Sequence, residues 1–422
     1  MDAKALISEM AAKARAASFT LVAASANERR DYLIRIADKI SKSKSQILTA
    51  NQIDLTAAQA AGISESLLDR LRLTEKRIDE LATGVRSIAN LSDPLGEVIA
   101  ERTLDNGLQL RQIRVPFGVV GMIYEARPNV TVDAGAILIK SGNAALLRGS
   151  TTAAHSNQVL VEIMRSCAEG LNISPDVIQL IPSHSRETTT ALLTARGEVD
   201  LVIPRGSAQL IQMVVDEATV PTIETGAGVC HVYIDKSADQ SMAIDIAINS
   251  KTHRPSTCNS AETILVHKDI ANQFMPSLLD ALITAGVVIN GDAATVAIAN
   301  KSGQKVKAAS DKSWSTEYGT LEINIGVVDD VLAAISHISR YGTNHTEAIV
   351  AKDDAAINLF TKLNDSVAIM INASTRFTDG EQMGFGAEIG ISNQKLHARG
   401  PMGIAEMTTS TWIVTGNGQV RS

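Results

Sequence analysis

The sequence predicts an α/β protein built from two doubly wound lobes and a protruding β-ribbon. Short apolar segments alternate with helical patterns between residues 117 and 234, and the same alternation returns between Ser241 and Asp379. This alternation is typical of parallel sheets that carry helices on both faces. A hairpin pattern at 101–113 belongs to neither run. The length of 422 residues fits this organisation, because single hydrophobic cores stop growing at roughly 250–300 residues.

The first part of the chain, residues 4–92, is predicted to be helical. Apolar side chains recur at i, i+3, i+4 and i+7 between Leu33 and Ile40, which is the spacing of one helix face. Asn27 precedes this pattern and suits an N-cap. We expect three or four helices here.

The predicted ribbon turns at Asp105-Asn106-Gly107, between alternating residues that begin at Glu101 and resume at Leu108–Ile113. Asn-Gly is a strong hairpin signal. Thr408–Val414 reads as a further strand that can pair with the ribbon. Because exposed strand edges tend to pair with another chain, we interpret ribbon and tail as an oligomerisation element.

The alternating runs define the remaining strands and helices. Between 117 and 234 the expected strands are Val119–Tyr124, Ala144–Leu147, Val177–Ile181, Leu201–Ile203 and His231–Ile234, with helices near 130–140, 151–169, 185–195 and 206–218. In the second run the expected strands are Thr263–Val266, Ile323–Val328, Glu347–Val350 and Val367–Ile371.

The composition limits the classes of partner. The net charge of -7 and the charged fraction of 20% provide no basic face for nucleic acid. Three cysteines without C-x-x-C spacing favour a reducing compartment and no metal site. Charged residues interrupt the first sixteen residues, and no apolar stretch reaches the roughly 18 residues of a membrane span. We therefore expect a cytoplasmic protein that binds small molecules and copies of itself.

Cys258 is the first candidate for chemistry. It lies in a polar loop, Arg254-Pro255-Ser256-Thr257-Cys258-Asn259-Ser260, between a predicted helix and a predicted strand. Substrate can reach a thiol in such a loop, although a lone cysteine is more often a buried core residue. Cys167 and Cys230 fall on a helix and at a strand start, and both are interpreted as core residues.

Two polar residues at strand ends add to this candidate site. Glu224 is followed by Gly226 and Gly228, which let backbone approach a ligand; it is either a base or a solvated strand end. Asn129 follows the first predicted strand of the sheet and opens a helix. Its amide can donate to an oxyanion, and it can also cap the helix.

The order Asn129, Glu224, Cys258 resembles that of the aldehyde dehydrogenase superfamily. Longer strings resemble its γ-glutamyl phosphate reductase branch and cover essentially the whole chain. They are Val115–Gly121, Tyr124–Thr131, Arg254–Asn259, Ser315–Tyr318, Tyr341–Glu347 and His397–Gly403. The resemblance implies a cofactor-binding domain at 1–100 and 114–228, a catalytic domain at 229–395, and the oligomerisation ribbon and tail at 101–113 and 396–422.

The resemblance also implies a cofactor site, although no G-x-G-x-x-G fingerprint follows a strand. The ribose end falls on Arg148 and Ser150, and Thr151 replaces the glutamate that is common in the superfamily. Since a guanidinium can grip a 2′-phosphate, NADPH is expected rather than NADH. Gly206 and Ser207 match a helix start that faces the pyrophosphate. Glu317 matches the glutamate that holds the nicotinamide ribose.

As the resemblance implies, the Cys258 thiolate attacks L-glutamyl 5-phosphate, phosphate leaves, and NADPH reduces the thioester to L-glutamate 5-semialdehyde, the second step of proline biosynthesis. Asn129 stabilises the oxyanion. The alternative is a hydrolytic NAD(P)-dependent aldehyde dehydrogenase with Glu224 as the base. Implied partners are a second copy of the chain and glutamate 5-kinase. Candidate cations for the substrate's phosphate and carboxylate are Arg127, Arg254, Arg376, His397 and Arg399.

Overall fold

A computed structural model describes residues 2–182, 185–206 and 208–421. The chain forms two compact units. Unit 1 comprises the residues up to Thr225, Gly384–Gly390 and those from Met402 onward, and unit 2 comprises Gly226–Met383 and Ile391–Pro401. The cofactor-binding and catalytic roles expected from the sequence stay predictions. Both units are α/β, as the sequence predicted.

Unit 1 begins with five helices rather than the three or four expected. They are α1 (Ala3–Ala23), α2 (Ala26–Lys42), α3 (Lys44–Ala60), α4 (Glu65–Leu71) and α5 (Glu75–Asn90). The count was too low because Ser43 alone separates α2 from α3 and because α4 is only seven residues long.

The N-cap of α2 is Ser25, so the assignment of Asn27 was wrong. Ser25 Oγ accepts from the Glu28 N–H at 3.2 Å, and the Glu28 carboxylate accepts from the Ser25 N–H at 2.8 Å. This reciprocal capping box satisfies two backbone donors, whereas Asn27 lies inside the first turn. The predicted apolar face from Leu33 to Ile40 is buried.

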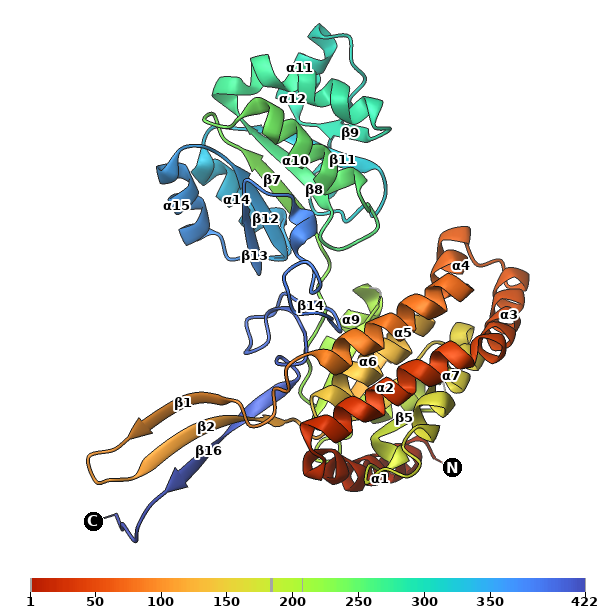
Figure 1. The fold of residues 1–422 in the computed structure, drawn as a ribbon. Coiled ribbons are helices and arrows are strands. Elements are labelled where there is room, and N and C mark those ends of the chain that lie inside the picture. The colour runs from red at the N-terminus through yellow and green to blue at the C-terminus, as the bar shows by residue number, and fades with distance from the viewer. Residues whose placement is uncertain (1, 183–184, 207, 422) are drawn as a thin grey trace. The chain divides into compact units, whose positions relative to one another are not determined.

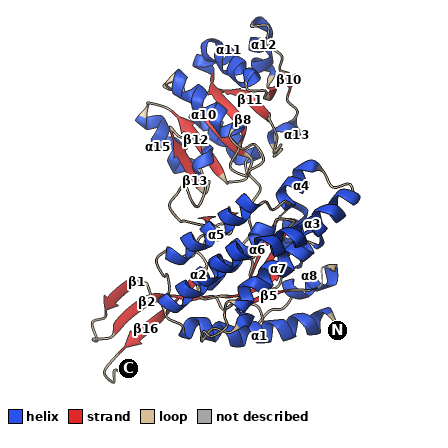
Figure 2. Cartoon of the chain, turned by 45° about the vertical axis from the view of Figure 1, so that its right-hand side comes forward, coloured by secondary structure: helices blue, strands red, loops and turns tan. Residues whose placement is uncertain are grey.

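The sheet of unit 1 has four parallel strands in the order β5-β4-β3-β6. The helices α6 to α9 follow these strands in turn, and the α1–α5 helices pack around them (Figure 2). The sheet's core joins Val119, Leu146 and Val202 to α1 and α8. The bounds are β3 (Val119–Tyr124), β4 (Ala144–Arg148), β5 (Ile178–Leu180), β6 (Leu201–Arg205), α6 (Pro128–Lys140), α7 (Ala154–Ser166), α8 (Arg186–Leu193) and α9 (Ala208–Glu217).

The ribbon of unit 1 is a three-stranded antiparallel sheet that extends from the helices (Figure 1). β1 (Val98–Thr103) pairs with β2 (Gln109–Pro116), and β2 pairs with β16 (Thr408–Thr415). Gly107 has a φ of 85° in the turn, which favours glycine. The tail therefore pairs with the ribbon of its own chain, while a role in oligomerisation stays a prediction.

The sheet of unit 2 has seven parallel strands in the order β10-β9-β11-β8-β7-β12-β13. The sequence did not predict β9 and β10, because they contain only four and two residues. The bounds are β7 (Cys230–Ile234), β8 (Ala261–His267), β9 (Val288–Gly291), β10 (Lys307–Ala308), β11 (Glu322–Val328), β12 (Thr346–Val350), β13 (Ala368–Ile371), β14 (Ile391–Ser392) and β15 (Gly400–Pro401).

Helices cover both faces of this sheet (Figure 1). Alternate residues of β7 enter different cores: Val232 and Ile234 pack with α10 and α11, whereas Tyr233 packs with α14 and α15. Such two-sided burial explains the continuous apolar strands of the sequence. The helices are α10 (Gln240–Thr252), α11 (Lys268–Thr284), α12 (Ala293–Lys301), α13 (Asp311–Trp314), α14 (Val331–Tyr341) and α15 (Asp354–Leu363).

Neither a membrane span nor a metal cluster is found in the described part of the chain. No helix there is long and apolar enough to cross a membrane. No three His, Cys, Asp or Glu side chains among those residues lie together as metal ligands.

Candidate active site

Cys258 lies at the amino-terminal edge of the unit 2 sheet, in the loop between α10 and β8. Its side chain is half-buried. A tight turn shapes the loop: the N–H and the Oγ1 of Thr257 both donate to the Arg254 carbonyl, at 3.3 and 2.8 Å. The Ser260 N–H donates to the Thr257 carbonyl at 2.9 Å. The thiol is thus presented on an ordered and accessible loop.

Arg376 contacts this loop and the residue before it through its guanidinium group. Its Nη1 donates to Thr257 Oγ1 at 2.8 Å, and its Nε contacts His253 Nδ1 at 3.4 Å. Burial lowers the pKa of Arg376, while Asp379 and Cys258 act in the opposite direction. A guanidinium in electrostatic contact with Cys258 favours the thiolate, which is the nucleophilic form.

A buried ion pair joins the two ends of the Cys258 loop. Lys251 Nζ, in the last turn of α10, lies 2.6 Å from Glu262 Oε2 on β8, and both side chains are fully buried. Burial raises the pKa of Glu262 to about 7 and lowers that of Lys251. Glu262 Oε1 also accepts from the Gly319 N–H at 3.3 Å. The pair therefore connects the loop to the segment of Glu317, whose own side chain is exposed.

Asn129 lies at the carboxyl edge of the unit 1 sheet, and it does not cap α6 as the sequence suggested. Arg127 is the N-cap, Pro128 is the first helical residue, and Asn129 Nδ2 donates to Asp133 Oδ2 at 3.2 Å. Burial raises the pKa of Asp133. Asp133 was not among the residues predicted from the sequence, although its i+4 spacing from Asn129 indicates such a contact on a helix. The amide of Asn129 is oriented by this contact.

Arg148, Ser150 and Gly206 of the expected cofactor residues lie at or just beyond the same edge, because β3, β4 and β6 are parallel, whereas Glu317 belongs to unit 2. Arg148 ends β4, is half-buried, and has a pKa lowered by burial. Ser150 caps the following short helix, and its Oγ accepts from the Thr152 N–H at 3.2 Å. Gly206 follows β6, where an added Cβ would meet the Glu125 side chain. Ser207 lies outside the described residues.

Glu224 follows a short extended segment that runs beside β6. Thr222 forms an isolated bridge to Val202, so the strand expected before Glu224 is reduced to one residue. Glu224 is half-buried, burial raises its pKa, and Thr222 Oγ1 donates to its Oε1 at 3.5 Å. The residue belongs to unit 1, together with Asn129 and Arg148.

The five candidate cations differ in their exposure and in their contacts. Arg254 is exposed in the Cys258 loop, and Arg376 fastens that loop. Arg399 Nη2 donates to the Asp365 carbonyl at 2.6 Å and lies 3.3 Å from the Asp365 carboxylate, which gives it a structural ion pair. His397 is exposed, and Arg127 lies at the N-cap of α6 in unit 1.

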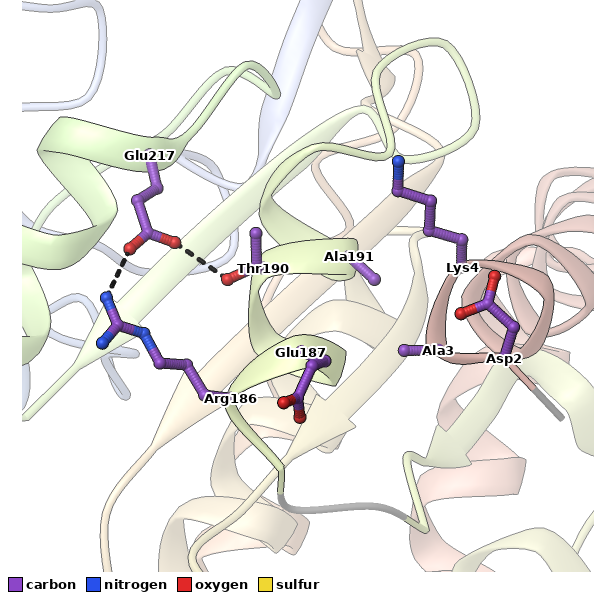
Figure 3. A pocket seen from close by; sticks show the side chains of 8 residues that line it. All are labelled: Asp2, Ala3, Lys4, Arg186, Glu187, Thr190, Ala191 and Glu217. Atoms are coloured by element: carbon purple, nitrogen blue, oxygen red, sulfur yellow. Dashed lines mark hydrogen bonds and ion pairs between the residues drawn. The ribbon is translucent and has the colours of Figure 1, made fainter.

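None of these residues lines the surface cavity found in unit 1. It has a volume of about 540 Å³ and is lined by α1, α8 and the end of α9 (Figure 3). Arg186 and Thr190 both bond Glu217 across it, at 2.9 and 2.8 Å. Because none of the predicted site residues lines this cavity, we assign it no part in the chemistry.

Comparison with known proteins identifies the class. A family model described as "Aldehyde dehydrogenase family" matches residues 2–313. The chain belongs to the aldehyde dehydrogenase family.

Within this family the chain groups with the γ-glutamyl phosphate reductases. It is 52% identical to the enzyme of that name from Kineococcus radiotolerans over 97% of this chain and 95% of the relative. It is 49% identical to that of Thermobifida fusca over 98% of both. The crystal structure of the Thermotoga maritima γ-glutamyl phosphate reductase superimposes with a TM-score of 0.96 at 42% identity, covering 99% of this chain and 100% of the other.

Proposed function

We propose that the protein reduces L-glutamyl 5-phosphate to L-glutamate 5-semialdehyde with release of phosphate, the second step of proline biosynthesis, through a thioester on Cys258. The observation that carries this proposal is the near full-length similarity to γ-glutamyl phosphate reductases, at 52% and 49% identity. The accessible Cys258 loop, with Arg254 within it and Arg376 bonded to it, supports the same reaction.

The acyl-transfer half of the reaction follows from the residues of this loop. The Cys258 sulfur forms a bond to the acyl carbon, and the bond from that carbon to the phosphate oxygen breaks, so inorganic phosphate leaves with the electron pair. Arg254 and Arg376 supply positive charge for the departing phosphate. Asn129 donates to the oxyanion, a contact whose loss typically costs on the order of 10²–10³-fold in rate.

The cofactor of the reductase is a nicotinamide nucleotide, and we propose NADPH. Arg148 fits a 2′-phosphate, since it is the cation at the end of β4 and the neighbouring Thr151 brings no carboxylate for a free ribose hydroxyl. Gly206, which lies between β6 and α9, fits the pyrophosphate, and Glu317 fits the nicotinamide ribose. When bound, NADPH supplies the hydride that reduces the thioester to the aldehyde.

We also propose a cytoplasmic enzyme that forms a homo-oligomer through the ribbon of β1, β2 and β16. Trp412, Ile413 and Val414 on β16 are 44%, 38% and 54% exposed, and apolar side chains on an exposed edge strand favour pairing with another chain. A labile acyl phosphate further suggests direct transfer from glutamate 5-kinase.

Replacing the nucleophile tests the proposed function. Cys258→Ser and Cys258→Ala should lose turnover while still binding NADPH, because a hydroxyl or methyl group does not replace a thiolate. The assay follows NADP reduction with glutamate 5-semialdehyde and phosphate, and fluorescence titration follows NADPH binding. Cys167→Ala is the matched control, since Cys167 is a buried cysteine at the end of α7. A Cys258 variant that keeps a tenth of the wild-type rate would contradict the proposal.

A further inference from the structure

We propose that Gly228, Cys230 and Thr343 form a seat that fixes the backbone of Cys258, which makes them positioning residues for the nucleophile. This inference rests on the proposed role of Cys258. All four residues belong to unit 2. We call the three residues the Cys258 seat.

The first contact of the seat is a backbone approach that only glycine permits. A Cβ added to Gly228 would overlap the carbonyl group of Cys258 and lie 2.7 Å from its Cα. Because these are backbone atoms, no side-chain rotation relieves the overlap. The main chain of the nucleophile therefore packs directly on the main chain at Gly228.

The second contact is a hydrogen bond from Cys230. Its Sγ donates to the Cys258 carbonyl at 3.2 Å, and the side chain is fully buried. Burial raises the pKa of Cys230 well above its usual range, so the group stays a thiol and keeps the proton it donates. His345 Nδ1 lies 3.8 Å from the same sulfur. Cys230 is thus a buried core residue, as expected, that also contacts the nucleophile.

The third contact fixes the segment 228–230, to which both Gly228 and Cys230 belong. Thr343 Oγ1 accepts from the Val229 N–H at 3.0 Å, between Gly228 and Cys230. The Thr343 carbonyl accepts from Asn393 Nδ2 at 2.8 Å, and Asn393 packs against Gly226. The motif Tyr341–Glu347, noted from the sequence, therefore supports the segment 228–230, which contacts the backbone of Cys258.

These contacts matter for catalysis because the attacking atom must be placed closely. A misplacement of about 1 Å can cost roughly 10²-fold in rate. Gly228 and Cys230 fix the position of the Cys258 carbonyl. Because the sulfur belongs to the same residue, the Cys258 seat also fixes where the sulfur lies. This explains why glycine occupies position 228 and a hydrogen-bond donor occupies position 230.

The chain offers matched controls for both substitutions. Gly84 in α5 has no atom within 4 Å of an added Cβ, so Gly84→Ala introduces the same methyl group without a clash. Cys167 Sγ donates to the Ile163 carbonyl at 3.2 Å, also from a buried position. Cys167→Ala therefore removes the same kind of hydrogen bond at a place remote in sequence from the nucleophile loop.

The experiment compares Gly228→Ala, Cys230→Ala and Cys230→Ser with Gly84→Ala and Cys167→Ala. It measures kcat and KM for phosphate-dependent oxidation of glutamate 5-semialdehyde, the pH profile of Cys258 alkylation by iodoacetamide, and thermal unfolding. We expect kcat to fall roughly 10²-fold in Gly228→Ala and about tenfold in Cys230→Ala, in which the Cys258 carbonyl loses a hydrogen-bond donor. Cys230→Ser should recover most of the loss. The alkylation profile should shift in both defective variants, and the controls should stay within about twofold.

Two outcomes separate the seat from the proposed function. If Cys258→Ser stays active, the proposed function fails whatever the seat variants do. If Cys258 is essential while Cys230→Ala and Gly228→Ala match their controls in kcat and in alkylation profile, the seat is wrong. Should Gly228→Ala not fold, Thr343→Val replaces it, because this change removes the acceptor of the Val229 N–H and retains the side-chain shape. An unchanged kcat in Thr343→Val and Cys230→Ala together also overturns the seat.

Discussion

At the scale of single residues, the polar groups of this protein are oriented by near neighbours in space. Asn129 is a good oxyanion donor only if its amide is fixed, and Asp133 at the next turn of α6 fixes it at 3.2 Å. Arg376 supports the Cys258 loop by donating a hydrogen bond to Thr257 Oγ1. Such supporting contacts let a side chain keep one geometry through the reaction.

Arg148 offers a test of cofactor choice at this scale. Arg148→Glu should weaken NADPH binding on the order of 10²-fold more than NADH binding, because only NADPH carries a 2′-phosphate for the guanidinium, and hydrogen bonds between charged groups contribute about 1.5–3 kcal/mol. Fluorescence titration with both cofactors measures the two dissociation constants. Arg148→Ala should show the same trend with a smaller span. Equal weakening of both cofactors would show that Arg148 supports folding rather than selecting the cofactor.

The site residues differ in how well the sequence could predict them. Cys258, Asn129 and Glu224 stand in motifs that resemble those of a known family, so the sequence could propose them as candidates, and their roles stay predictions. The sequence shows Gly228 beside a strand and Cys230 as a core cysteine. Their contacts with Cys258 join residues about thirty positions apart, so these contacts are seen only in the folded chain. The pairing of Arg399 with Asp365 was hidden for the same reason.

At the scale of elements, apolar periodicity predicted most strands and helices, because burial on both faces leaves continuous apolar strands. The errors concern a very short strand and the start of one helix. Strand β10 has two residues, and both are exposed. The N-cap of α2 is marked in the sequence by the capping-box pattern Ser-x-x-Glu, which places it at Ser25 with Glu28 rather than at Asn27.

His345, the residue just before β12, is a buried histidine that makes the stability of the folded chain depend on pH. His345 is fully buried, and burial lowers its pKa from 6.5 to about 4. The unfolded chain therefore binds a proton between these values that the folded chain does not. The contribution of His345 to the free energy of unfolding is present above pH 6.5 and is lost as the pH falls towards 4.

We expect this loss to reach ~3 kcal/mol at pH 4, from about 1.4 kcal/mol per pKa unit. Urea unfolding between pH 7 and pH 4 measures it, and His345→Gln should lose less stability than the wild type over this interval. His397→Gln, at an exposed position, should follow the wild type. If the free energy of unfolding falls equally with pH in the wild type and in His345→Gln, the imidazole of His345 does not cause the loss.

At the scale of the whole molecule, the fate of the thioester separates a reductase from a hydrolytic dehydrogenase. The proposed nucleophile Cys258 belongs to unit 2, and the carboxylate Glu224 belongs to unit 1. A hydrolytic enzyme uses such a carboxylate to activate water. In an acyl-phosphate reductase an efficient base of this kind would divert the acyl-enzyme to free glutamate before hydride transfer. We therefore expect Glu224 to be a poor activator of water.

The consequence is that oxidation of glutamate 5-semialdehyde by this protein should require inorganic phosphate. In the reverse reaction phosphate is the group that releases the acyl chain from Cys258, so NADPH formation should stop after about one turnover in phosphate-free buffer. Arsenate, which mimics phosphate, should restore steady turnover. Absorbance at the NADPH band follows both phases, and Glu224→Gln should retain the phosphate-dependent rate. Steady NADPH formation without phosphate that disappears in Glu224→Gln would instead identify Glu224 as a hydrolytic base.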